Sequence, residues 1–139
     1  MSRKAIIALL LIVLAIIAAL IVWRWVFTKS DVSVSSKKAE VEIEAVVLTH
    51  EFEENEEAAN AKYLGKVITV SGSVNTITED EQNLSVYLKN AEDISGVMCT
   101  ISKASINTSP IKTGDQVKIK GICDGYLMDV KLNKCSLEK

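Results

Sequence analysis

The strongest constraint on this chain of 139 residues is an uncharged apolar run from Ala5 to Trp23. These 19 residues, mostly Ile, Leu, Ala and Val, would form about 28 Å of helix at ~1.5 Å per residue, close to the ~30 Å hydrocarbon core of a bilayer. Inside lipid a single segment satisfies its backbone polar groups as a helix. The run therefore predicts a transmembrane helix over 5–27, with the lipid bilayer as its partner.

The residues that follow the run favour a retained anchor. Trp23, Trp25 and Phe27 suit the aromatic belt at a membrane interface, and Arg24 and Lys29 can reach the lipid headgroups. The alternative is a cleavable signal peptide. Its apolar region would be shorter and would end in small residues, whereas Trp-Arg-Trp stands at this position. We therefore expect a single-pass membrane protein.

Basic residues flank both ends of the apolar run, so charge counting leaves the orientation nearly balanced. Arg3 and Lys4 precede the run, and Arg24 and Lys29 follow it. We expect residues 1–4 to lie in the cytoplasm and the C-terminal part to lie outside the cytoplasmic membrane. The opposite orientation stays open.

Two segments of different character follow the predicted anchor. Residues 28–39 are polar and Ser-rich, which indicates a tether. From 40 to 64, apolar residues recur near the helical period with glutamates between them, and Gly65 is placed to end a helix. The apolar positions are Val41, Ala45, Leu48, Phe52, Ala59 and Tyr63. We predict an amphipathic helix over 40–64 whose eight glutamates form a solvated face, with an acidic docking surface as the alternative.

After Gly65 the apolar period changes to two, which is typical of half-buried strands. Five such runs, separated by turn sequences, carry alternating apolar residues: Ile68, Val70 and Val74; Leu84, Val86 and Leu88; Val97, Cys99 and Ile101; Val117, Ile119 and Cys123; Met128, Val130 and Leu132. Gly72 and Gly121 suit the bends that barrel closure requires. We predict an all-β, five-stranded OB-fold barrel over 65–139, capped by the preceding helix. An open sandwich is the alternative.

The last two strands are predicted to join through a two-residue turn at Asp124-Gly125. This register pairs Cys123 with Tyr126 and places Cys135 about 30 Å further along an extended strand, so a Cys123–Cys135 disulfide would contradict it. Cys99 is easier to accept as a disulfide partner, but the strand pattern does not choose its mate. The chain has no Cys-x-x-Cys sequence, which disfavours zinc binding and thioredoxin-type chemistry.

Two stretches resemble a known family. The run Asn-Glu-Glu-Ala-Ala-Asn-Ala-Lys-Tyr at 55–63, with Val70-Ser71-Gly72-Ser73-Val74, resembles the opening of the bacterial tRNA_anti-like family, and 114–126 resembles its last hairpin. The resemblance covers about 46–137. It implies an OB fold preceded by a helix, commonly on small exported or membrane-anchored proteins, and it carries no activity or catalytic residues.

The charge balance disfavours nucleic-acid binding. Residues 66–139 contain nine lysines and nine acidic residues, whereas a nucleic-acid groove is basic. Stacking of single-stranded bases would also need aromatic residues on the second and third strands, where Tyr87 stands alone.

We therefore predict a binding or interaction module, with an unidentified protein or oligomeric ligand and without enzymatic activity, cofactor or metal. The expected ligand face is that of the second and third strands, with Tyr87 and Met98, together with the loops around 79–83 and 124–126. The second of these loops contains Tyr126. The alternative is a nucleic-acid-binding OB fold held at the cytoplasmic face of the membrane. His50, beside Glu51 and Glu54, is interpreted as a solvated residue rather than a metal ligand.

Overall fold

The computed structural model describes residues 3–27, 34–106 and 110–138; within 3–27 it describes the side chains of 6, 7 and 10–24. The chain divides into two compact units, Met1–Val32 and Ser33–Lys139.

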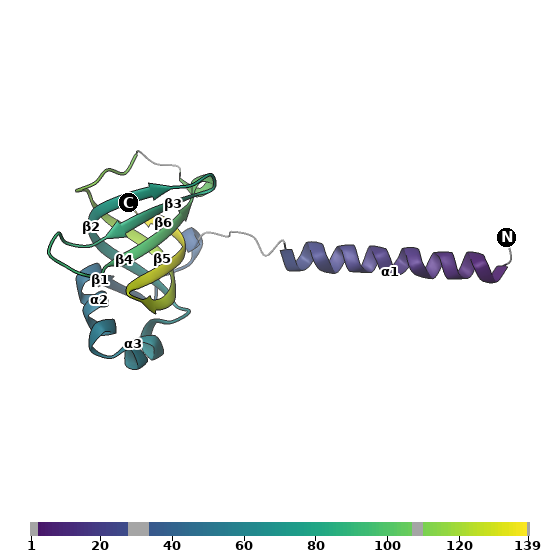
Figure 1. Cartoon of the computed structure of the whole chain (residues 1–139), viewed down its shortest axis with the longest axis horizontal. Coiled ribbons are helices and arrows are strands. Elements are labelled where there is room, and N and C mark those ends of the chain that lie inside the picture. The colour runs from purple at the N-terminus through teal and green to yellow at the C-terminus, as the bar shows by residue number, and fades with distance from the viewer. Residues whose placement is uncertain (1–2, 28–33, 107–109, 139) are drawn as a thin grey trace. The chain divides into compact units, whose positions relative to one another are not determined.

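The first unit contains the helix α1 (Arg3–Phe27) (Figure 1). Its described large apolar side chains are exposed, from 44% at Ile6 to 65% at Leu14. Among the described residues, none of the helices combines the length and the hydropathy required to cross a membrane. The helix over this segment is confirmed, and its insertion into a bilayer stays a prediction from the sequence.

The second unit is a closed β-barrel. Its strands are β1 (Val41–Glu44), β2 (Val67–Glu79), β3 (Asn83–Leu88), β4 (Val97–Ser102), β5 (Gln116–Leu127) and β6 (Asp129–Glu138). The sheet order is β1-β2-β3-β4-β6-β5, and an antiparallel β2–β5 pairing closes it. Strand β1 stands at the end of this order as an extra strand, and β2–β6 form the closed barrel. This closure confirms the predicted five-stranded OB-fold barrel and excludes the open sandwich.

The segment 40–64 differs from the predicted single helix. Residues 41–44 form β1, which pairs in parallel with the first half of β2, because Val-Glu-Ile-Glu alternates with the period of a strand. Two helices follow, α2 (Ala45–Glu54) and α3 (Glu56–Tyr63). They separate at Asn55, whose side-chain oxygen accepts a hydrogen bond from Ala58 N at 3.1 Å and so caps α3.

The two helices cover one end of the barrel (Figure 1). The predicted cap residues Leu48, Phe52, Ala59 and Tyr63 are all buried, at 0–3% exposure. The ring of Phe52 lies 5.7 Å from that of Tyr126 on β5, centroid to centroid. Helix α3 ends as predicted, with Gly65 in the left-handed region at φ 75°.

The predicted inward positions of the strands are confirmed with one exception. Met128 is 81% exposed, because the β5–β6 turn lies at this residue, with Leu127 opposite Asp129. Gly125 instead lies at a register irregularity within β5. Cys123 consequently pairs with Leu132 rather than with Tyr126, and the predicted two-residue turn is wrong.

The predicted tether over 28–39 is too long at its C-terminal end. Residues 34–36 form a 3₁₀ turn, η1 (Val34–Ser36), and Val34 is fully buried. The chain between β4 and β5 contains a second short turn, η2 (Lys103–Ser105). Residues 28–33 and 107–109 lie outside the described parts of these segments.

Candidate ligand-binding face

Strands β3 and β4 carry a ladder of partly exposed side chains on the outside of the barrel. They alternate with buried residues, and they pair across the two strands as Asn83 with Ser102, Ser85 with Thr100, and Tyr87 with Met98. We call these six residues the β3–β4 face. All six side chains are uncharged, and together they offer hydroxyls, one amide, one thioether and one aromatic ring. The structure therefore places Tyr87 and Met98 side by side, as predicted.

The ring of Tyr87 is held in place by contacts from two sides. Its hydroxyl donates a hydrogen bond to Asp129 Oδ1, which also accepts from Gly96 N at 3.0 Å. Lys89 Nζ lies 5.6 Å from the ring centroid, within the range of a cation–π contact. Burial, followed by the hydrogen bond and charge of Asp129, raises the pKa of Tyr87 to about 12. The phenol is therefore a fixed neutral donor at physiological pH.

The raised pKa of Tyr87 predicts a loss of stability in alkali. Because the pKa in the unfolded chain is about 10, this contribution is complete below pH ~10 and disappears as the pH rises through about 12. We expect Tyr87→Phe to lower the free energy of unfolding by about 1 kcal/mol at neutral pH. We also expect it to make the alkaline decline less steep. Urea unfolding across this range measures both effects.

Tyr126→Phe is the matched control for that prediction, because it keeps the hydrogen bond between Tyr87 and Asp129. It should decline in alkali almost as steeply as the wild type, because the charge of Tyr126 is the smallest of the contributions to the raised pKa of Tyr87. An equally steep decline in Tyr87→Phe would contradict the assignment.

Tyr126 does not lie on the β3–β4 face. It is on β5, opposite Val130, and its partly buried ring stacks on Phe52 at an interplanar angle of 20°. Its charge contributes to the raised pKa of Tyr87. The ring of Tyr126 packs against α2 instead of standing open to a ligand. The strand pattern of β5 did not indicate this contact.

Asp129 is a functional candidate that the sequence pattern did not indicate. It lies 42 residues from Tyr87 in the chain, and nothing in its neighbourhood on β6 indicates the contact. The predicted loop 79–83 is itself ordered by Asp80, whose Oδ1 accepts from the backbone N–H groups of Gln82 and Asn83 at 2.8 and 2.7 Å. These two bonds lower the pKa of Asp80.

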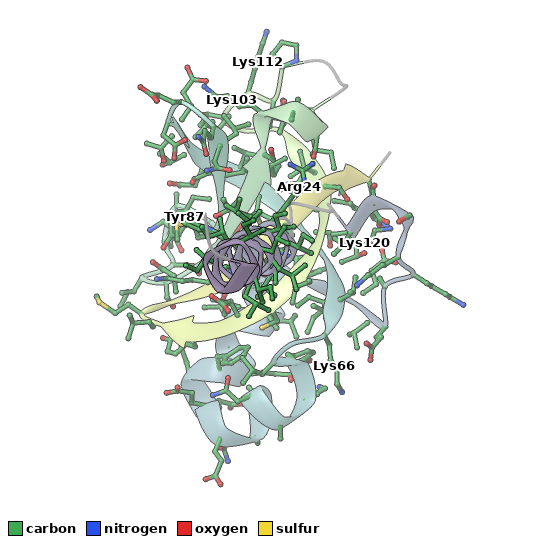
Figure 2. The ribbon with its side chains drawn as sticks, turned by 90° about the vertical axis from the view of Figure 1, so that its right-hand side faces the viewer. Arg24, Lys66, Tyr87, Lys103, Lys112 and Lys120 are labelled. Carbon is green, nitrogen blue, oxygen red and sulfur yellow. The ribbon has the colours of Figure 1, made fainter. Side chains whose placement is uncertain are left out.

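The lysines labelled in Figure 2 do not gather into a basic strip. In Figure 2 the labelled Lys66, Lys103, Lys112 and Lys120 are spread around the barrel, away from Tyr87. Several lysines are also neutralised: Lys120 Nζ lies 2.7 Å from Glu138 Oε1, Lys103 Nζ lies 3.3 Å from Glu79 Oε2, and Lys118 pairs with Glu42. The six residues of the β3–β4 face are themselves uncharged. Lys89 lies over the Tyr87 ring and Lys131 lies opposite Met98 on β6, whereas phosphate groups along a nucleic acid need a continuous row of cations.

His50 is a surface residue of α2, as predicted. Its Nδ1 lies 3.5 Å from Glu54 Oε2, and both side chains are about two-thirds exposed. Glu51 accepts hydrogen bonds from Lys62 and Tyr63 instead. Within residues 3–27, 34–106 and 110–138, no group of three or more His, Cys, Asp or Glu could hold a metal ion.

A closed barrel of this strand order, with a cap at one end, defines an OB-fold protein. The model of the tRNA_anti-like family matches residues 1–137, and the chain belongs to this family. The match confirms the resemblance seen in the sequence and extends it to the N-terminus. No curated protein matches the sequence.

Several solved structures are similar to the chain. One is a lipoprotein from Klebsiella pneumoniae subsp. pneumoniae, named for an expected nucleic-acid-binding role, with 17% identity and a TM-score of 0.56 over 81% of this chain and 100% of that one. Another is a structure of yeast Stn1 and Ten1, with 15% identity and a TM-score of 0.45 over 74% of this chain and 64% of that one. At these identities the first likeness supports the OB fold alone.

Proposed function

We propose that this chain is a binding module anchored in a bacterial cytoplasmic membrane, with its OB barrel outside the cytoplasm and an oligomeric or protein ligand on the β3–β4 face. The uncharged β3–β4 face around the fixed Tyr87 ring is the observation that carries this proposal. A surface of hydroxyls and an amide recognises a ligand through hydrogen bonds, whereas a nucleic acid requires a basic groove.

The anchor is proposed from two properties of residues 5–27. The run from Ala5 to Trp23 has no charge over about one bilayer thickness. The described large apolar side chains of α1 are at least 44% exposed, from Ile6 onward. A helix that is apolar on all sides requires an apolar environment, and a bilayer provides one.

Membrane insertion and orientation are tested with the full chain in bacterial cells. We expect the protein to stay in the membrane fraction after alkaline extraction. Alkaline phosphatase fused after Lys139 should be active, because this enzyme requires export. An inactive fusion on a stably expressed protein would contradict the extracytoplasmic position and favour the cytoplasmic alternative.

The ligand face is tested by photo-crosslinking in intact cells. A crosslinking amino acid at Thr100 lies in the middle of the β3–β4 face, and the same residue at Ser71 on β2, also partly exposed, is the matched control. We expect adducts from position 100 and not from position 71. Adducts from 100 that disappear on nuclease treatment would contradict our proposal and support nucleic-acid binding.

A further inference from the structure

Two of the three cysteines lie together inside the barrel. Cys99 on β4 and Cys135 on β6 are both fully buried, and hydrogen bonding to Cys135 is the main cause of the raised pKa of the Cys99 thiol. Strands β4 and β6 are neighbours in the sheet and run in parallel. The two thiols therefore meet across one strand pair of the barrel although they are far apart in the sequence.

The backbone of β6 explains how these cysteines come into contact. The register places Cys99 opposite Leu132 and Cys135 opposite Ile101, so the two are diagonal neighbours. An irregularity falls between the two pairs, and Lys134 has a left-handed φ of 53°. Such an irregularity bends a strand and re-aims the next side chain, which brings Cys135 within reach of Cys99.

The Cys135 sulfur occupies the space that Gly121 leaves on β5. It lies 3.3 Å from the carbonyl oxygen of Leu132, 2.5 Å from the position where a Cβ at Gly121 would stand. Because residue 121 is glycine, no side chain at this position displaces the sulfur. The third cysteine, Cys123, lies on β5 opposite Leu132.

We propose that Cys99 and Cys135 form a disulfide bond that fastens β4 to β6 when the domain folds in an oxidising compartment. The oxidant is a disulfide compound, such as oxidised glutathione or a protein disulfide. The two thiols give up their protons, one sulfur–sulfur bond forms in the chain, and the bond of the oxidant breaks to leave two thiols. Formation in the cell rests on the proposed extracytoplasmic location.

The bond forms before the barrel is complete. Hydrogen bonding to Cys135 and burial raise the pKa of the Cys99 thiol well above its usual range, so the folded barrel holds little of the thiolate that attacks a disulfide. During folding both sulfurs are accessible. Once formed, the bond is buried with its two residues and resists reduction.

The first test uses the purified full chain in detergent, unfolded and refolded with a mixture of reduced and oxidised glutathione. After acid quenching and alkylation, peptide mapping should find Cys99 linked to Cys135 and Cys123 alkylated. Cys123→Ser is the matched control and should keep the bond, whereas Cys99→Ser should lose it. The oxidised chain should melt about 10 °C higher than the reduced one. Alkylation of both Cys99 and Cys135, or a bond to Cys123, would overturn the proposal.

The second test reads the redox state in cells, by alkylating thiols during acid lysis of cells that express the full chain. A Cys99–Cys135 bond there supports both the pair and the extracytoplasmic location. Reduced cysteines in cells, together with the bond in the refolded protein, support the pair and overturn the location. The two proposals therefore fail in distinguishable ways.

Discussion

Gly121→Ala lowers the free energy of unfolding by about 2–3 kcal/mol, which is the expected cost of overpacking a dense core. A Cβ at residue 121 would lie 2.5 Å from Cys135 Sγ, 3.2 Å from Asn133 O and 3.2 Å from Leu132 Cβ. Its φ lies outside the left-handed region, so the loss comes from the clash and not from backbone strain. Denaturant unfolding of residues 33–139, which contain the whole core cluster, measures it under reducing conditions.

The contact with Cys135 is isolated by a double-mutant cycle. Cys135→Ala removes the sulfur that the new methyl group would meet, so Gly121→Ala should cost about 1–2 kcal/mol less in that background. Gly72→Ala is the matched control on β2. Its Cβ would meet Ala45 and Leu88 at 3.1 and 3.4 Å, which predicts a smaller loss. A Gly121→Ala loss that Cys135→Ala leaves unchanged would contradict the assigned position of the sulfur.

Gly121 also shows which parts of the barrel local sequence could predict. A glycine inside a strand indicates a bend, and the register of β5 and β6 does shift between Lys120 and Ile122. The strand periods likewise predicted the inward residues, because alternation is a local property of the chain. The atom that occupies the space beside Gly121 belongs to β6. The sequence around residue 121 therefore does not predict it.

The segments that were predicted wrongly contain local residues that indicate, or obscure, the observed structure. Val41 and Ala45 are four residues apart, and this helical spacing predicts a helix that includes residues 41–44. The alternation of Val41 and Ile43 with glutamates is the period of a strand and indicates β1 instead. Asn55 is a good N-cap, and two glutamates in the first turn of α3 follow it. At the last hairpin, Asp124-Gly125 is a strong turn sequence, but Gly125, at φ 105°, serves an irregularity within β5.

The candidate site was predictable in part for the same reason. Tyr87 and Met98 share a face because each follows the period of its own strand, and β3 and β4 are consecutive in the chain. Asp129, which fixes the Tyr87 hydroxyl, comes from a strand 42 residues away. Tyr126 leaves the face because its ring packs on Phe52 of α2. These contacts depend on how the elements assemble.

Phe52→Ala is expected to lower the free energy of unfolding by about 3–5 kcal/mol, a large part of the stability of a domain of this size. The side chain is 1% exposed. Its ring centroid lies 5.7 Å from that of Tyr126 and 6.1 Å from that of Tyr63. The truncation therefore removes buried area and two aromatic contacts at the junction of α2, α3 and β5. Denaturant unfolding of residues 33–139 provides the measurement.

Val47→Ala on the same helix is the matched control, because Val47 is 46% exposed and its truncation should change the free energy of unfolding by less than about 0.5 kcal/mol.

The comparison of Phe52→Ala with the wild type also tests whether α2 and α3 belong to the cooperative unit of the barrel. If Phe52→Ala melts the helices while the strands stay folded, the unfolding curves from far-UV circular dichroism and tyrosine fluorescence would separate. We expect them to coincide, because Tyr126 joins the helical cap to the strand pair that carries Asp129.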